Sequence, residues 1–231
     1  MTEGFAGRLG AVIFDMDGVL ADTEPIQEEA LGVFLALRGK SLSPAENAAM
    51  IGLNHRAFWA TIIERLGLDE SVEECVRGYE PILLSRLVGL PAAPGARELV
   101  LALVAADVPL AVASSSFRPV VEMTLGAIGL RDAFRAIVSG EEVRNGKPAP
   151  ETYLMAAARL GVEPRRCVAV EDSASGVRAA TAAGMTCLGI TSSYSTKDQL
   201  QATRTVRSLT EITAGDLAAL AAEGQSRPLR E

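Results

Sequence analysis

The stretch Leu9–Gly18, with the sequence LGAVIFDMDG, decides the fold of this chain. It joins an apolar run that ends at Phe14 directly to two acidic residues, Asp15 and Asp17. A short and nearly continuous apolar run is typical of a strand that is buried on both faces, as in a parallel sheet. Ligands of open α/β sheets bind at the carboxyl ends of the strands. The sequence therefore predicts two carboxylates at the edge of a sheet where a ligand would bind.

Four more apolar runs of this kind follow along the chain, and each leads directly into polar residues. They span Val108–Ala113, Phe134–Val138, Cys167–Val170 and Thr186–Ile190. Segments with the helical spacing of apolar residues occur at Ala96–Ala106, Pro119–Gly129, Pro150–Gly161 and Ser173–Gly184. This alternation of strands and helices predicts right-handed βαβ units and an α/β fold with a doubly wound, Rossmann-like parallel sheet.

One long segment interrupts the alternation. Between Glu24 and Leu90 only helical patterns occur, and a segment of this length is too long for an ordinary crossover between strands. We therefore expect an all-helical cap domain of residues 23–91, inserted into an α/β core domain of residues 1–22 and 92–231 that carries the catalytic site. A cap above the strand ends could control access to that site.

Composition and charge exclude several classes of protein. The 231 residues include 22 Lys and Arg against 29 Asp and Glu, a net charge of −7, which argues against a nucleic-acid-binding protein. The longest apolar stretch, Leu99–Ala106, is far too short to span a membrane. Three scattered cysteines form no zinc or disulfide pattern, and the first residues contain no long apolar segment. We expect a cytoplasmic protein that is a monomer or a weak dimer.

Acidic side chains gather at the carboxyl edge of the predicted sheet. Asp15, Asp17, Glu171 and Asp172 would repel one another there unless a cation lay among them. Oxygen ligands without a histidine suit Mg²⁺, which also binds phosphate oxygens. Taken singly, each aspartate has a plainer interpretation, because aspartates often form turns or cap helices. Together these residues predict a Mg²⁺ site.

Lys147 and two serines would complete a site for a phosphate ester. Lys147 lies in the loop NGKPAPETY, where its ammonium could face the phosphate, although a single lysine is more often solvated. Ser114 and Ser115, with nearby backbone N–H groups, could surround phosphate oxygens. Asp15 could then attack phosphorus and form an aspartyl-phosphate. Asp17 could protonate the leaving oxygen and later deprotonate a water molecule.

These motifs together resemble the haloacid dehalogenase superfamily. The resemblance is carried by DMDGVLADTEP from Asp15 onwards, the strand before Ser114, Lys147 in NGKPAPETY, and VEDSASGVRAATAAGM with Glu171 and Asp172. The helical insertion is similar to the small cap of the branch that contains beta-phosphoglucomutases and sugar phosphatases.

The resemblance implies a role for each matching residue. Asp15 would be the nucleophile, and Asp17 the acid and base that also offers Mg²⁺ its backbone carbonyl. Asp172 would be a metal ligand, assisted by Glu171. The phosphate would be bound by Ser114 and Lys147, and Thr23 would lie at the hinge of the cap.

The cap sequence bears on the choice between a phosphatase and a phosphosugar mutase. Mutases of this branch commonly carry a histidine in the first cap helix where this chain has Gln27, which favours hydrolysis. A cap arginine of the mutases falls near His55 and Arg56 without a clean match. Gln27, His55 and Arg56 are therefore candidates for a substrate pocket, together with Trp59 and Arg77. A packed tryptophan on a solvent-facing helix edge is the alternative.

We expect a Mg²⁺-dependent phosphatase that acts on a small phosphorylated metabolite, a sugar phosphate above all. A phosphosugar mutase is the alternative. A dehalogenase would have no use for Asp17 or for the pair Glu171 and Asp172. A signalling module phosphorylated on Asp15 would need neither a helical cap nor an acid/base residue at Asp17.

Overall fold

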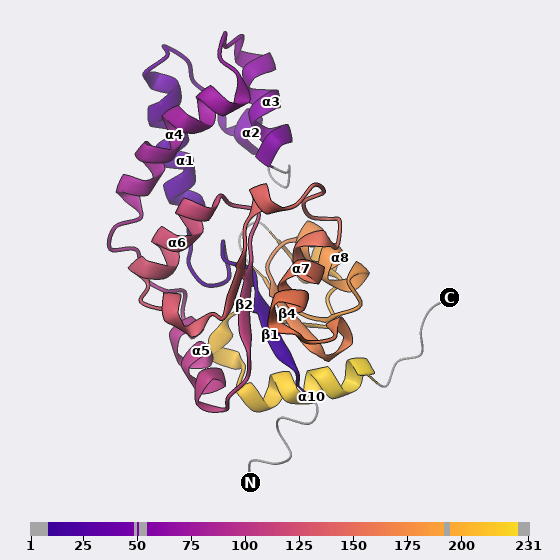
Figure 1. The fold of residues 1–231 in the computed structure, drawn as a ribbon. Coiled ribbons are helices and arrows are strands. Elements are labelled where there is room, and N and C mark those ends of the chain that lie inside the picture. Colours follow the sequence, from indigo (N-terminus) through magenta and orange to yellow (C-terminus); the bar gives the residue numbers. More distant parts are fainter. Residues whose placement is uncertain (1–8, 49, 51–54, 192–194, 226–231) are drawn as a thin grey trace.

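A six-stranded parallel sheet forms the centre of the molecule (Figure 1). The computed structural model describes residues 9–48, 50, 55–191 and 195–225. Among these residues the strand order is β3-β2-β1-β4-β5-β6. The strands are β1 (Ala11–Phe14), β2 (Leu110–Ala113), β3 (Ala136–Val138), β4 (Cys167–Glu171), β5 (Thr186–Ile190) and β6 (Arg204–Val206). The predicted doubly wound parallel α/β sheet is confirmed.

Helices cover both faces of the sheet because the strand residues alternate between two apolar cores. Val12 and Phe14 belong to the core beneath α5 (Ala96–Ala105), α6 (Arg118–Ala127) and α10 (Ala214–Gln225). Ala11 and Ile13 belong to the core beneath α7 (Glu151–Leu160) and α8 (Ala174–Ala182). The shorter helical elements are α9 (Lys197–Leu200) and four 3₁₀ turns at Arg131–Ala133, Gly140–Glu142, Pro164–Arg166 and Leu209–Glu211.

The register of the strands brings the acidic motifs side by side. Phe14 pairs with Val170, so the residues that follow them, Asp15 and Glu171, lie at the same edge. The backbone N–H of Asp15 donates to the carbonyl of Val170 over 2.9 Å. The backbone positions of both acidic residues are thereby set by the sheet itself.

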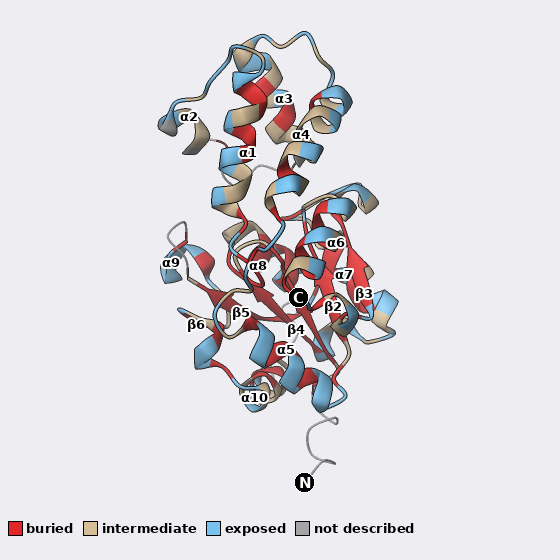
Figure 2. Cartoon of the chain, turned by 90° about the vertical axis from the view of Figure 1, so that its left-hand side faces the viewer, coloured by how far each residue is buried: buried red, intermediate tan, exposed pale blue. Residues whose placement is uncertain are grey.

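In the described part of the chain between β1 and α5, four helices form what we call the cap helices. They are α1 (Glu24–Ala36), α2 (Pro44–Ala48), α3 (His55–Leu66) and α4 (Val72–Arg86). They stand above the carboxyl ends of the strands (Figures 1 and 2). Ser71 begins α4 with a reciprocal capping box to Glu74, which satisfies N–H groups at the start of the helix.

The cap helices have an apolar core of their own. Trp59 is fully buried there, with its ring centroid 5.2 Å from those of Phe34 and Tyr79. Edge-to-face contacts of this kind stabilise aromatic pairs. Trp59 is therefore a packing residue, which decides between the two interpretations of it from sequence. Among the described residues, no helix is long and apolar enough to cross a membrane.

Candidate active site

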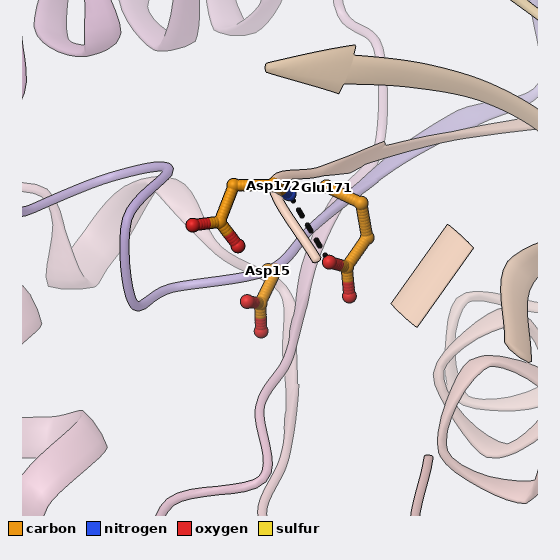
Figure 3. Close-up of side chains that lie close together, drawn as sticks. All are labelled: Asp15, Glu171 and Asp172. Atoms are coloured by element: carbon orange, nitrogen blue, oxygen red, sulfur yellow. Dashed lines mark hydrogen bonds between the residues drawn. The ribbon is translucent and has the colours of Figure 1, made fainter. Parts of the chain in front are cut away.

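Three buried carboxylates meet where β1 and β4 end (Figure 3). Asp15 follows β1, Glu171 is the last residue of β4, and Asp172 comes directly after it. One oxygen of each lies within 4.8 Å of the others. The strand ends predicted four converging carboxylates, of which Asp15, Glu171 and Asp172 meet here.

Lys147 bridges two of these carboxylates. Its Nζ donates to Asp15 Oδ1 over 2.7 Å and to Glu171 Oε1 over 2.6 Å. The side chain is only 5% exposed. Burial disfavours the ammonium, but the charges of Asp15 and Glu171 outweigh it and raise the pKa of Lys147. Lys147 is therefore a fixed cation that also lines the cavity above the strands.

Glu171 is saturated by hydrogen bonds. Its Oε1 accepts from Lys147 and, over 2.8 Å, from the hydroxyl of Tyr153. Its Oε2 accepts from the backbone N–H groups of Asp172 and Ser173 and from the hydroxyl of Ser173. A carboxylate offers about four lone-pair sites, so these donors leave Glu171 no free oxygen for a metal ion. Its place in the structure is that of an anchor for Lys147.

The other two carboxylates of the cluster, Asp15 and Asp172, are buried with too little positive charge nearby to offset their own. Burial raises the pKa of Asp15 to about 7, with the charges of Glu171 and Asp17 adding to the rise and Lys147 opposing it. Burial, Asp15 and Glu171 together raise the pKa of Asp172 to about 9. Buried oxygens that share one ammonium fit a hard divalent cation, which would offset their repulsion. The donor set could thus hold a metal ion between Asp15 and Asp172.

Asp17 lines the same cavity as Asp15 and is held by four donors. Its Oδ1 accepts from the hydroxyl of Thr23 and from Gln27 Nε2, the latter over 2.9 Å. Its Oδ2 accepts from the hydroxyls of Ser116, over 2.8 Å, and Ser114, over 3.5 Å. Donors from the cap helices and from the sheet therefore orient a single carboxylate. The side chain of Asp17 is not part of the three-carboxylate cluster.

A cavity of roughly 300 Å³ lies between the strand ends and the cap helices. From the sheet side it is lined by Asp15, Asp17, Ser115, Ser116, Lys147, Asp172, Ser173 and Ser175. From the cap side it is lined by Glu24, Gln27, Glu28, Leu31, Asn47, Met50, Phe58 and Tyr79. Lys147 is the one cation among the lining residues that the structure describes.

The residues predicted from sequence differ in where they lie relative to the cavity. Gln27 lines the cavity, whereas Ser114 and Thr23 are buried behind it and contact Asp17. His55 and Arg56 begin α3, but their side chains lie outside the described part of the structure.

Several contributors were not anticipated. Ser116 and Tyr79 line the cavity, and Tyr153 supports Glu171, although the sequence analysis predicted none of the three. Conversely, Arg77 and Trp59 are not among the described lining residues. The third serine of SSS offered a sequence signal for Ser116. The two tyrosines offered none, because only the folded chain brings them to the site.

Gly18 is needed for the close approach of its turn to Asp172. A Cβ at Gly18 would lie 2.0 Å from Asp172 Oδ2, and the backbone φ is +74°. We expect Gly18→Ala to displace the Asp172 carboxylate and to lower kcat/KM for a phosphate ester at least tenfold, roughly the effect of disturbing the surroundings of a metal site. Gly184→Ala is the matched control, since Gly184 has φ +82° but open space around it. Equal losses in kcat/KM for both variants would contradict this role of Gly18.

Comparison with known proteins finds relatives that cover most of this chain. The sequence model of the haloacid dehalogenase-like hydrolases matches residues 12–190. Fructose-1-phosphate phosphatase YqaB of Escherichia coli is 33% identical over 197 residues, which cover 82% of this chain and 98% of that protein. A bifunctional riboflavin kinase/FMN phosphatase of Arabidopsis thaliana is 32% identical over 193 residues, covering 83% of this chain. This chain spans only 51% of the length of that plant protein.

A solved structure shares the whole architecture. The crystal structure of beta-phosphoglucomutase from Clostridium difficile superposes with a TM-score of 0.80 at 25% sequence identity. The match covers 95% of this chain and 100% of that one. The likeness therefore includes the cap helices as well as the sheet.

Proposed function

Since the chain belongs to the haloacid dehalogenase-like hydrolase family and is a phosphoric monoester hydrolase, we propose that it hydrolyses small sugar phosphates through an aspartyl-phosphate on Asp15, with Mg²⁺ as cofactor. The observation that carries the proposal is the buried contact between Asp15 and Lys147 at the base of the cavity. This contact supports the proposal, because a carboxylate beside a buried ammonium could attack a phosphate that the ammonium holds.

The first chemical step belongs to Asp15. Its free carboxylate oxygen attacks phosphorus, and the bond between phosphorus and the leaving oxygen breaks. Lys147 has three N–H donors, of which Asp15 and Glu171 take two, so the third is left for a phosphate oxygen. Ser115 and Ser116 line the same part of the cavity. The hydroxyl of Ser116 already donates to Asp17, so Ser115 is the serine that offers a further donor.

Proton transfer belongs to Asp17. Protonated, it gives its proton to the leaving alkoxide; ionised again, it takes a proton from the water that hydrolyses the aspartyl-phosphate. The hydroxyls of Thr23 and Ser116 keep its carboxylate oriented between these steps. Thr23 therefore acts on the acid and base rather than on the substrate.

Asp15 and Asp172 would hold Mg²⁺, together with the backbone carbonyl of Asp17. When bound, the ion supplies positive charge that offsets the repulsion between the nucleophile and the phosphate. Glu171 contributes through Lys147, because its own oxygens are occupied. The sequence predicts that Glu171 is either a metal ligand or a helper of Asp172, and its hydrogen bonds support an indirect role.

The cavity suits a hydroxylated substrate. Gln27, Glu28 and Asn47 present amide and carboxylate groups from the cap side, where sugar hydroxyls could bond. Leu31 and Phe58 supply apolar contacts beside them. The name of the relative that acts on fructose 1-phosphate supports the same class. The cap domain bounds of 23–91, a cytoplasmic location and a monomer or weak dimer remain predictions.

Phosphate release is the direct test. The full chain is assayed with fructose 1-phosphate, beta-glucose 1-phosphate and FMN, in Mg²⁺ and in excess chelator. We expect release from at least one sugar phosphate, and a loss on the order of 100-fold or more in chelator that Mg²⁺ reverses. Release that is insensitive to the chelator would contradict the metal. No release from any ester, with a stable phosphorylated Asp15, would favour the signalling module.

A mutase is the second candidate, because the likeness to a beta-phosphoglucomutase covers the whole chain. Gln27 stands where mutases of this branch commonly carry a histidine, and its Nε2 donates to Asp17. Unlike a histidine, a neutral amide does not exchange a proton near neutral pH. With beta-glucose 1-phosphate and a glucose bisphosphate primer, we expect free phosphate and no glucose 6-phosphate. Accumulation of glucose 6-phosphate would establish the mutase instead.

A further inference from the structure

Tyr153 contacts both Lys147, the proposed phosphate-binding cation, and Glu171, the carboxylate that anchors it. It lies on the first turns of α7, a few residues after the Lys147 loop, and is fully buried. Its hydroxyl donates to Glu171 Oε1 over 2.8 Å. The Lys147 Nζ lies 5.2 Å from the centroid of its ring, a distance at which a cation is attracted to the ring face. One side chain thus contacts the cation by its face and the anchor of that cation by its hydroxyl.

The same oxygen of Glu171 serves two donors. Lys147 and Tyr153 both donate to Oε1, so the charge of that oxygen is divided between an ammonium and a phenol. Gly176 makes the room for it, since a Cβ there would lie 1.7 Å from Glu171 Oε1. Burial and the charge of Glu171 raise the pKa of Tyr153, which keeps its hydroxyl a donor. Glu171 Oε1 therefore lies between Lys147 and Tyr153, beside the backbone of Gly176.

We propose that Tyr153 is a positioning residue that sets how firmly Lys147 is held by Glu171, and hence how strongly Lys147 binds phosphate. Without the hydroxyl, Oε1 has only Lys147 to compensate its charge in a buried setting. The contact between Lys147 and Glu171 then strengthens and draws the ammonium away from the cavity. The inference rests on the proposed function, because it takes Lys147 as the phosphate-binding cation.

The test is the binding of inorganic phosphate to the full chain in Mg²⁺, measured by calorimetry. We expect Tyr153→Phe to raise the Kd for phosphate about tenfold, the size of one hydrogen bond to a charged group. KM for a hydrolysed ester should rise by the same factor with kcat nearly unchanged, as when binding is lost equally before and in the transition state. A Kd equal to that of the wild type would overturn the inference.

Thr124→Val is the matched control. Thr124 is a buried residue of α6 whose hydroxyl has no hydrogen-bond partner among the described residues, so the variant removes a buried hydroxyl away from the site. It should leave the Kd for phosphate within about twofold of the wild type. A tenfold change in this control as well would make the effect of Tyr153→Phe a general loss of packing and overturn the inference.

A double-mutant cycle shows whether Tyr153 acts through Glu171. In a Glu171→Gln background, Tyr153→Phe should add less than about twofold to the Kd, because the charge that the hydroxyl shares is gone. A rise of the Kd by the full tenfold factor in that background would overturn the inference.

If Tyr153→Phe does not fold, 3-fluorotyrosine at position 153 provides a second variant. It keeps the size of the side chain, and its hydroxyl is a stronger donor. It should bind phosphate at least as tightly as the wild type, and tenfold weaker binding would overturn the inference.

The measurements separate this inference from the proposed function. A wild-type chain that binds phosphate and hydrolyses no ester would refute the phosphatase, whereas the effect of Tyr153→Phe on binding would still stand. A wild-type chain that hydrolyses sugar phosphates and loses no affinity for phosphate in Tyr153→Phe would refute the positioning role alone.

Discussion

Asp15→Asn is expected to lower phosphate release on the order of 10⁴-fold or more, because a neutral amide cannot form the acyl-phosphate bond. The fold should persist. Asp15 follows β1 and is held by a backbone hydrogen bond to Val170, which the substitution leaves in place. An asparagine Oδ1 could also still accept from Lys147, and the substitution relieves the repulsion that burial and Glu171 impose on Asp15. Steady-state release and thermal denaturation, measured on the same sample, check both parts.

Asp132→Asn is the control for this substitution. Asp132 is exposed on a 3₁₀ turn and lines no part of the cavity, so activity should stay within about twofold of the wild type. Turnover by Asp15→Asn within tenfold of the wild type would remove Asp15 from the reaction. Phosphate trapped on another residue of the wild-type chain would do the same.

Asp17→Asn is expected to separate good leaving groups from poor ones. Release of a sugar alkoxide requires a proton, so its rate should fall by about 10²–10⁴-fold, the usual contribution of a general acid. Nitrophenolate leaves without one, so 4-nitrophenyl phosphate should still give a burst of product as the aspartyl-phosphate forms. Hydrolysis of that intermediate lacks its base, and steady-state turnover after the burst should be slow. Rapid-mixing kinetics with both esters measure the difference.

Asp22→Asn provides the comparison on a nearby exposed carboxylate. It should show no burst and no difference between the two leaving groups beyond that of the wild type. Equal losses for the sugar and the aryl ester in Asp17→Asn, without a burst, would contradict the assignment of Asp17 as acid and base.

The order of the elements could be predicted from sequence because buried parallel strands form continuous apolar runs. All five predicted strands are present, and helices occupy the segment between Glu24 and Leu90. The sixth strand, β6, escaped prediction because it has only three residues and lies at the sheet edge with Arg204 exposed. The last helix, α10, also escaped prediction. It is rich in alanine and buries only a narrow face, with Leu217, Leu220 and Ala221 on it.

The candidate site was predictable only in part, for a physical reason. Asp15, Glu171 and Asp172 follow strand ends, and a sheet brings strand ends together by its topology. The contacts that assign roles depend on how side chains turn. Nothing in the sequence shows that Glu171 exhausts its oxygens on neighbouring donors, or that Tyr153 from α7 reaches it. The family resemblance singled out Gln27 in the first cap helix, but only the folded chain brings its amide to Asp17.

Trp59 gives this chain an intrinsic fluorophore within the cap helices. It is the sole tryptophan in the sequence, and its neighbours Phe34 and Tyr79 belong to the cap helices. Its emission on denaturation therefore follows the cap helices alone, whereas far-ultraviolet circular dichroism follows every helix and strand. Coincident unfolding curves would mean that the two parts melt as one cooperative unit. An earlier fluorescence transition would mean that the cap helices open while the sheet still stands.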